Sequence, residues 1–309
     1  MNNEKPDISS TGSRTTRELV LKTVFFVCAL LTVLTTAGII LSLITEAIQF
    51  FSMVSPIDFY TGTEWSPTFG DKAFGILPLV MGTLTITIYA ALVALPIGLA
   101  TAIYLSEYAG ERTRAYLKPA LEVLAGVPTV VYGYFALVYI TPVLKSVIPV
   151  GVSTFNAMSP AIVMGIMIIP MVSSISEDAM SSVPESLRNA AYGLGATKFQ
   201  VSTSVVVPAS VSGITSAYIL AISRAVGETM IVTVAAGANA RMVNPFNPVD
   251  ALQPLMPMTK AMIDLSASEV AGDSAAYKSL FAIGLTLFVI TFVMNLISDI
   301  IAHRYKEDY

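Results

Sequence analysis

The sequence predicts an all-α fold, a polytopic membrane protein with six transmembrane helices. Of its 309 residues, 54% are hydrophobic and 12% are charged, and the mean hydropathy is +0.72. This composition is typical of chains that lie mostly within a bilayer. Six uncharged runs reach the length of about 20 residues that a helix needs to cross ~30 Å of hydrocarbon. In chain order the runs are Thr23–Thr45, Ala73–Ser106, Val123–Leu144, Ser146–Ser176, Phe199–Ser223 and Ser279–Ser298.

The charges between the runs predict the orientation. With the N-terminus in the cytoplasm, the inner segments hold eleven Lys and Arg residues and the outer loops hold five, with Arg224 set apart. Positive residues favour the cytoplasmic side, so we expect both termini there. Residues 1–19 are polar and are expected to form a poorly ordered tail. Residues 20–309 are expected to form one transmembrane domain.

Composition also argues against several classes of function. The net charge of −4 and the lack of a basic patch interleaved with aromatic residues argue against nucleic acid as a partner. Membrane lipid is an expected partner because of the long apolar runs. The only cysteine, Cys28, leaves no internal disulfide. The only histidine, His303, lies in the C-terminal tail, which leaves no histidine triad or histidine metal cluster within the spans. We therefore expect no catalytic residues, metal or cofactor in this chain.

Two charges follow the fifth run, in the stretch "ILAISRAVGETMIVTVAAG", which contains Arg224 and Glu228. A charge at the bilayer centre costs about 2.5–3.5 kcal/mol on insertion scales, so such residues usually face a bundle interior or a pathway. Four residues apart on one helix, the two side chains can form an ion pair that only neutralises itself. Alternatively, Arg224 offers its planar guanidinium to an anion. Glu228 would then hold the arginine and weaken the site enough for release.

Other polar residues of the spans have simpler interpretations. Glu177 and Asp178 end the fourth run and are expected to be solvated, with a gate or a partner contact as the alternative. Ser173, Ser174 and Ser223 could line a polar path, although serine in a membrane helix more often bonds the backbone. The spans also contain prolines that are expected to kink their helices, through packing or as hinges: Pro96, Pro128 and Pro170.

Residues 184–208, "PESLRNAAYGLGATKFQVSTSVVVP", predict a two-helix elbow between the fourth and fifth runs. Pro184 can begin the first helix, Gly193 and Gly195 end it, and Thr197 can cap the second. Small and apolar residues fall at helical spacing on one face of the first helix: Leu187, Ala190, Ala191 and Leu194. Such a face suits docking into a shallow cleft on another protein, and an interfacial helix on the membrane is the alternative.

The elbow resembles the EAA loop of ATP-binding-cassette importer permeases, whose pattern is Glu-Ala-Ala, three residues, Gly, nine residues and Ile-x-Leu-Pro. Asn189 stands in the glutamate place, Ala190 and Ala191 follow it, and Gly195 takes the glycine place. The pattern is completed by Val205, Val207 and Pro208. The resemblance implies that the elbow, through Leu187, Asn189, Ala190, Ala191 and Gly195, couples the membrane domain to an ATPase.

Most of the chain beyond the tail resembles the C-type permease subunit of phosphate-specific importers. The matching stretches include "FGILPLVMGTLTITIYAALVALPIGLATAIYLSEYA", "LEVLAGVPTVVYG" and "SRAVGETMIVTVAAG". The paired A-type subunit shares much of this pattern and stays an alternative, whereas "SISEDA", "GETMIV" and "TEW" favour the C type.

This resemblance implies half of a pathway for inorganic phosphate in a prokaryotic inner membrane, with Arg224 and Glu228 serving phosphate movement. The implied partners are an A-type permease, two copies of a cytoplasmic ATPase and an extracytoplasmic phosphate-binding protein. The chain has no Gly-Lys dipeptide and hence no Walker A loop, so ATP and Mg²⁺ are expected on the ATPase and this chain is not itself an enzyme.

Three other functions are alternatives to phosphate import. Within the importer class, the anion could be sulfate or molybdate, because a permease passes what its binding protein delivers. An ion-coupled secondary transporter would show inverted repeats and broken helices in corresponding halves, which the sequence does not display. A purely structural membrane subunit would retain transport when Arg224 is replaced.

Overall fold

The computed structural model describes residues 11–68, 70–149 and 151–304 and confirms the all-α fold. The described residues contain one short antiparallel hairpin, in which β1 (Trp65–Ser66) pairs with β2 (Ala73–Phe74). Five helices of the described residues are long and apolar enough to cross a membrane, and a bent pair, counted as one span, makes six.

The helical bundle is built around the close packing of α3 (Leu77–Ile103) on α7 (Met158–Ser181). Glycine makes this approach possible, because a Cβ on Gly165 would stand 2.8 Å from the Ala90 carbonyl oxygen. Small residues at helix interfaces let backbones approach closely in membranes, where dispersion contacts hold helices together. Helix α11 (Val211–Val226) packs against both, and α15 (Ala275–Arg304) packs on α11.

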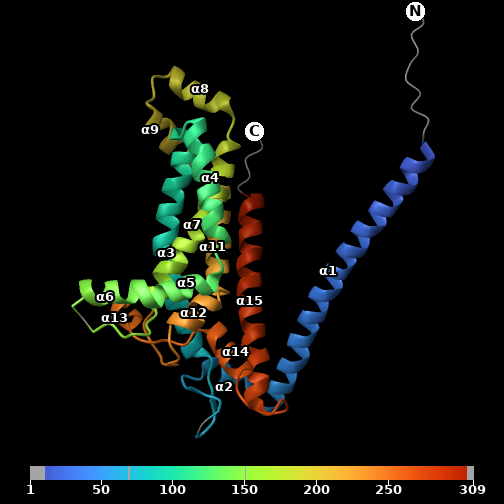
Figure 1. Ribbon diagram of the computed structural model, residues 1–309, viewed down its shortest axis with the longest axis vertical. Coiled ribbons are helices and arrows are strands. Elements are labelled where there is room, and N and C mark those ends of the chain that lie inside the picture. Colours follow the sequence, from blue (N-terminus) through green and yellow to red (C-terminus); the bar gives the residue numbers. More distant parts are fainter. Residues whose placement is uncertain (1–10, 69, 150, 305–309) are drawn as a thin grey trace, which may run out of the picture.

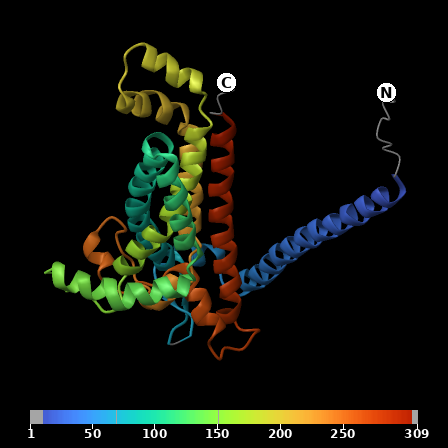
Figure 2. The same ribbon diagram turned by 45° about the horizontal axis from the view of Figure 1, so that its top comes forward.

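Helix α1 (Thr11–Met53) leans away from this bundle (Figures 1 and 2). The C-terminal end of α1 meets the start of α15, where the Lys278 ammonium of α15 contacts Gln49 and lies 3.8 Å from Glu46. Helix α1 already begins at Thr11, within the stretch predicted to be a polar tail. Residues 1–10 lie outside the described part of the chain.

The start of α1 and the end of α15 lie at the same end of the bundle as α8 (Glu185–Gly193), which we call the elbow end (Figure 1). The opposite end holds the β1–β2 hairpin and a group of short helices. These are α2 (Pro56–Thr61), α12 (Met230–Ala235), α13 (Pro248–Ala251) and α14 (Met258–Ser266).

The third apolar run does not form one helix through the bundle. Helix α4 (Glu111–Gly126) runs beside α7, and the chain then turns at Val127 and Pro128. Pro128 has no N–H to donate to the Leu124 carbonyl one turn earlier, and the Tyr132 hydroxyl donates to that carbonyl instead at 2.6 Å. Pro128 therefore breaks the helix rather than kinking it.

The apolar segment after this break runs across the bundle rather than along it (Figures 1 and 2). It comprises α5 (Thr129–Phe135), a π-helical turn η2 (Ala136–Ile140) and α6 (Thr141–Val147). Buried polar contacts fix it to the start of α7, because Thr141 donates to the Ser159 hydroxyl at 3.0 Å and Asn156 donates to Thr141 at 3.2 Å. The span predicted over 123–144 is thus confirmed in part, because Thr129–Val147 is long and apolar enough to cross a membrane but begins only after Pro128.

The fifth run is also broken. The segment Lys198–Ala209 meets Val211–Val226 at an angle of 70°, with Ser210 between them. Its first part contains α9 (Lys198–Val201), the π-helical η3 (Ser202–Val206) and α10 (Val207–Ala209). A further π-helical turn, η1 (Tyr104–Tyr108), continues α3 toward the elbow end. Pro96 and Pro170, by contrast, lie inside continuous helices.

Candidate functional site

Arg224 lies in the last turn of α11 and is exposed within this single chain. A cation at this position is stabilised by the negative end of the helix dipole, since the last carbonyls have no intrahelical partners. None of the ion pairs or hydrogen bonds formed by side chains of the described residues involves its guanidinium. Its five donors are therefore available to a solute.

Glu228 does not pair with Arg224, so the predicted ion pair is wrong. Helix α11 ends at Val226, which places the two residues on different elements. The Glu228 carboxylate turns forward and accepts from the backbone N–H of Met230 at 3.0 Å and of Ile231 at 3.3 Å, at the start of α12. Its own carbonyl accepts from the Thr259 hydroxyl of α14 at 2.9 Å. Glu228 thus shapes the turn that follows Arg224.

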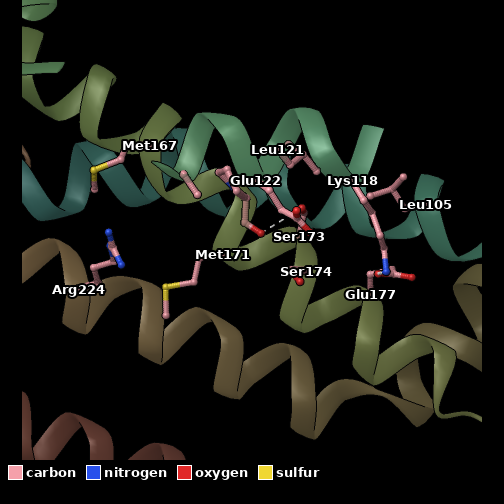
Figure 3. Close-up of a pocket in the computed structure, with 12 residues that line it drawn as sticks. Leu105, Lys118, Leu121, Glu122, Met167, Met171, Ser173, Ser174, Glu177 and Arg224 are labelled. Atoms are coloured by element: carbon pink, nitrogen blue, oxygen red, sulfur yellow. Dashed lines mark hydrogen bonds and ion pairs between the residues drawn. The ribbon is translucent and has the colours of Figure 1, made fainter. Parts of the chain in front are cut away.

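Arg224 lines a cavity of about 320 Å³ between α4, α7 and α11 (Figure 3). The other side chains that line it are Leu105, Lys118, Leu121, Glu122, Ala125, Met167, Pro170, Met171, Ser173, Ser174 and Glu177. Arg224 lies at one end of the cavity, Lys118 and Glu177 lie at the other, and Glu122 lies between them. Glu228 and Ser223 are not among the lining residues, whereas the predicted polar residues Ser173 and Ser174 are.

Glu177 is buried, so the expectation that it is solvated is wrong. Its side chain is 1% exposed and lies between two cations of α4, in contact with Arg114 and 2.6 Å from the Lys118 ammonium. Burial of this carboxylate is tolerated because both cations compensate its charge. Its neighbour Asp178 is exposed, as the sequence predicts.

The elbow has the predicted two helices and the predicted ends. The first helix closes through paired hydrogen bonds, from Ala196 N–H to the Ala191 carbonyl at 3.1 Å and from Gly195 N–H to the Tyr192 carbonyl at 2.9 Å. Gly195 has φ of +85°, a conformation that favours glycine at this position. Thr197 and Gln200 then cap the second helix reciprocally.

The predicted elbow face is divided between two surfaces. Leu187 and Ala191, one turn apart, pack against the chain's own apolar cluster around Met180 and Val201. Asn189 and Ala190 are exposed, and Leu194 is 91% exposed. Of the predicted face, Leu187 and Ala191 are thus partly buried within the chain, whereas Ala190 and Leu194 are open to a partner.

Arg188 fastens the elbow to the bundle, a role that the sequence did not reveal. Its guanidinium donates to the carbonyls of Met180 at 2.8 Å and Val183 at 2.9 Å, where α7 ends. It also pairs with Glu107 of η1 at 3.2 Å. Movement of α8 would therefore be transmitted to both α7 and the end of α3.

Ionisable side chains inside a helical membrane bundle usually mark a solute or ion pathway, and the cavity that contains Arg224 has this character. The family described as "Binding-protein-dependent transport system inner membrane component" matches residues 94–307. The chain belongs to this family. It is therefore a permease subunit of an ATP-binding-cassette importer.

Among curated proteins, the chain is 34% identical to the probable ABC transporter permease protein YqgH of Bacillus subtilis, over 97% of this chain and 95% of that protein. It is 32% identical to the phosphate transport system permease protein PstC of Mesorhizobium japonicum, over 94% and 92% of the two chains. Within the family it is thus PstC-like.

Solved structures confirm the fold. A chain of a bacterial alginate ABC transporter superposes with a TM-score of 0.62 at 14% identity, covering 94% of this chain and 98% of that one. A chain of the MetNI methionine ABC transporter gives a TM-score of 0.56 at 14% identity, covering 75% and 96%. These transporters carry different solutes on one fold, so the fold alone does not select a substrate.

Proposed function

We propose that this chain forms half of the transmembrane pathway for inorganic phosphate, with Arg224 as an anion site on the path. The observation that carries the proposal is an arginine that has no partner among the described residues and lines a cavity inside the bundle. A planar guanidinium can bond two phosphate oxygens at once, a geometry that suits this anion. The likeness to PstC permeases supports phosphate over other oxyanions.

The elbow end faces the cytoplasm in this proposal, and both termini lie there. Two copies of an ATPase bind ATP and Mg²⁺ and dock on the elbows of this chain and of a second, A-type permease. A phosphate-binding protein delivers the anion at the opposite end. The transmembrane permease domain extends from α1 to α15, with residues 184–208 as its coupling loop.

Glu228 has a supporting role in this proposal instead of a place on the path. Its carboxylate holds the turn between α11 and α12 and so fixes the end of the helix that carries Arg224. The anion instead meets Glu122, which lines the cavity without a partner among the described side chains. Repulsion from this carboxylate shortens the stay of an anion, as a pathway site requires.

The choice of anion is tested by uptake into proteoliposomes that contain the assembled complex with its native binding protein. We expect ATP-dependent uptake of radiolabelled phosphate that persists with a hundredfold excess of sulfate or molybdate. An excess of unlabelled phosphate should abolish it. Uptake of labelled sulfate or molybdate, without uptake of phosphate, would assign the other anion and contradict the proposal.

A further inference from the structure

The cluster of Arg114, Lys118 and Glu177 separates two cavities. Lys118 and Glu177 line the cavity that contains Arg224, whereas Arg114 lines a second cleft of about 440 Å³ at the elbow end. That second cleft is also lined by Ser181 and Arg188. An anion that moves from Arg224 past Glu122 toward the elbow end therefore reaches this cluster.

The charges of the cluster do not cancel. One carboxylate, 1% exposed, is shared by two cations whose side chains are 38% and 41% exposed. Arg114 also donates to the Ser181 hydroxyl at 3.3 Å, and that hydroxyl donates to Glu177 at 3.4 Å. Taken by itself, the cluster thus has two partly exposed cations for one buried carboxylate, which also lines the cavity that contains Arg224.

From this arrangement we infer a second anion site, at which inorganic phosphate leaves the pathway by exchange with Glu177. A phosphate that arrives from Arg224 binds Lys118 and Arg114 and displaces the carboxylate from them. Glu177 then competes for the same cations and drives the anion into the cleft at the elbow end. Release is favoured because the competing carboxylate is part of the site and its effective concentration is high.

This inference rests on the proposed function and is tested by inhibition from the cytoplasmic side. Proteoliposomes are loaded with ATP and increasing unlabelled phosphate, and initial uptake of labelled phosphate is measured. Intervals are kept short so that phosphate from ATP hydrolysis stays far below the loaded amount. Internal chloride at equal ionic strength controls for salt effects.

Removing the carboxylate and removing a cation should shift the inhibitory concentration of internal phosphate in opposite directions. Glu177→Gln removes the competitor, so the internal phosphate concentration that halves uptake should fall about tenfold. Lys118→Gln removes a ligand, so that concentration should rise about tenfold. Asp178→Asn, the same chemical change at the adjacent exposed carboxylate, should leave it unchanged.

Shifts of both single variants in the same direction, or no shift in either, would overturn the inference and leave only a structural link between α4 and α7. If Glu177→Gln does not assemble, Lys118→Gln decides alone, since a fall or no change in that variant contradicts the second site. The wild-type vesicles separate the two proposals. If wild type takes up phosphate but both variants shift the inhibitory concentration in the same direction, the exit site alone is rejected. If wild type takes up no phosphate, the phosphate pathway itself is rejected.

Discussion

Replacing Arg224 by glutamine is expected to lower ATP-driven phosphate uptake about 10- to 100-fold while the complex still assembles. A charge-assisted hydrogen bond contributes about 1.5–3 kcal/mol, and each 1.4 kcal/mol corresponds to a factor of about ten. Glutamine keeps a similar polarity but loses the charge and the paired donors. Assembly should persist because no other described side chain depends on the guanidinium. Initial uptake rates and ATPase activity of the purified complex measure both effects.

The neighbouring variants separate an anion site from a neutralising pair. Glu228→Gln keeps an oxygen that can accept from Met230 and Ile231, so uptake should stay within about twofold of wild type. For the same reason, adding Glu228→Gln to Arg224→Gln should not restore uptake. Arg112→Gln, which removes an exposed arginine at the start of α4 away from the cavity, is the matched control. Recovery in the double variant would show that the two charges only neutralise each other.

Replacing Leu194 by aspartate is expected to weaken binding of the ATPase about 10- to 100-fold. Leu194 is 91% exposed at the end of α8, beside the exposed Ala190. Burying a leucine in a partner's cleft contributes about 1.5–3 kcal/mol, and a carboxylate in the same cleft adds a desolvation cost. The measurement is the amount of ATPase that copurifies with the permease, together with its affinity for the reconstituted membrane subunits.

Leu194→Met is the matched control, because it keeps an apolar side chain of similar volume and should retain the ATPase. Leu187→Asp has a different expected effect, since Leu187 packs against the chain's own cluster and its replacement should destabilise the elbow itself. Full ATPase binding by Leu194→Asp would place the docking surface elsewhere on the elbow end.

Much of the fold follows from patterns that depend on neighbouring residues alone. Long uncharged runs predicted α1, α3, α7 and α15, because helix length and apolar composition are local properties. The elbow was predicted in detail, since Gly195 and the Thr197 cap act within a few residues of themselves. Local chemistry is sufficient for such features.

The sequence-based predictions are wrong where contacts between residues far apart in the sequence determine the structure. Helix α4 does not appear among the long uncharged runs, because it contains the cations Arg114 and Lys118, which pair with Glu177 on another helix. The spacing of Arg224 and Glu228 suggests an ion pair. The Glu228 carboxylate instead accepts hydrogen bonds from two backbone N–H groups at the start of α12. The sequence therefore identified Arg224 as a candidate but could not identify Lys118, Glu122 and Glu177 as its neighbours in one cavity.

The most direct test of the phosphate pathway is protection of its cavity wall by phosphate. Ser174 is exposed and lines the cavity, so Ser174→Cys in a Cys28→Ser background provides a single thiol there. We expect a water-soluble methanethiosulfonate reagent to label it about tenfold more slowly when phosphate is present at about ten times its dissociation constant. Arg224→Gln should remove this protection. An equal labelling rate with and without phosphate, in a Ser174→Cys complex that still transports phosphate, would show that the pathway does not run through this cavity.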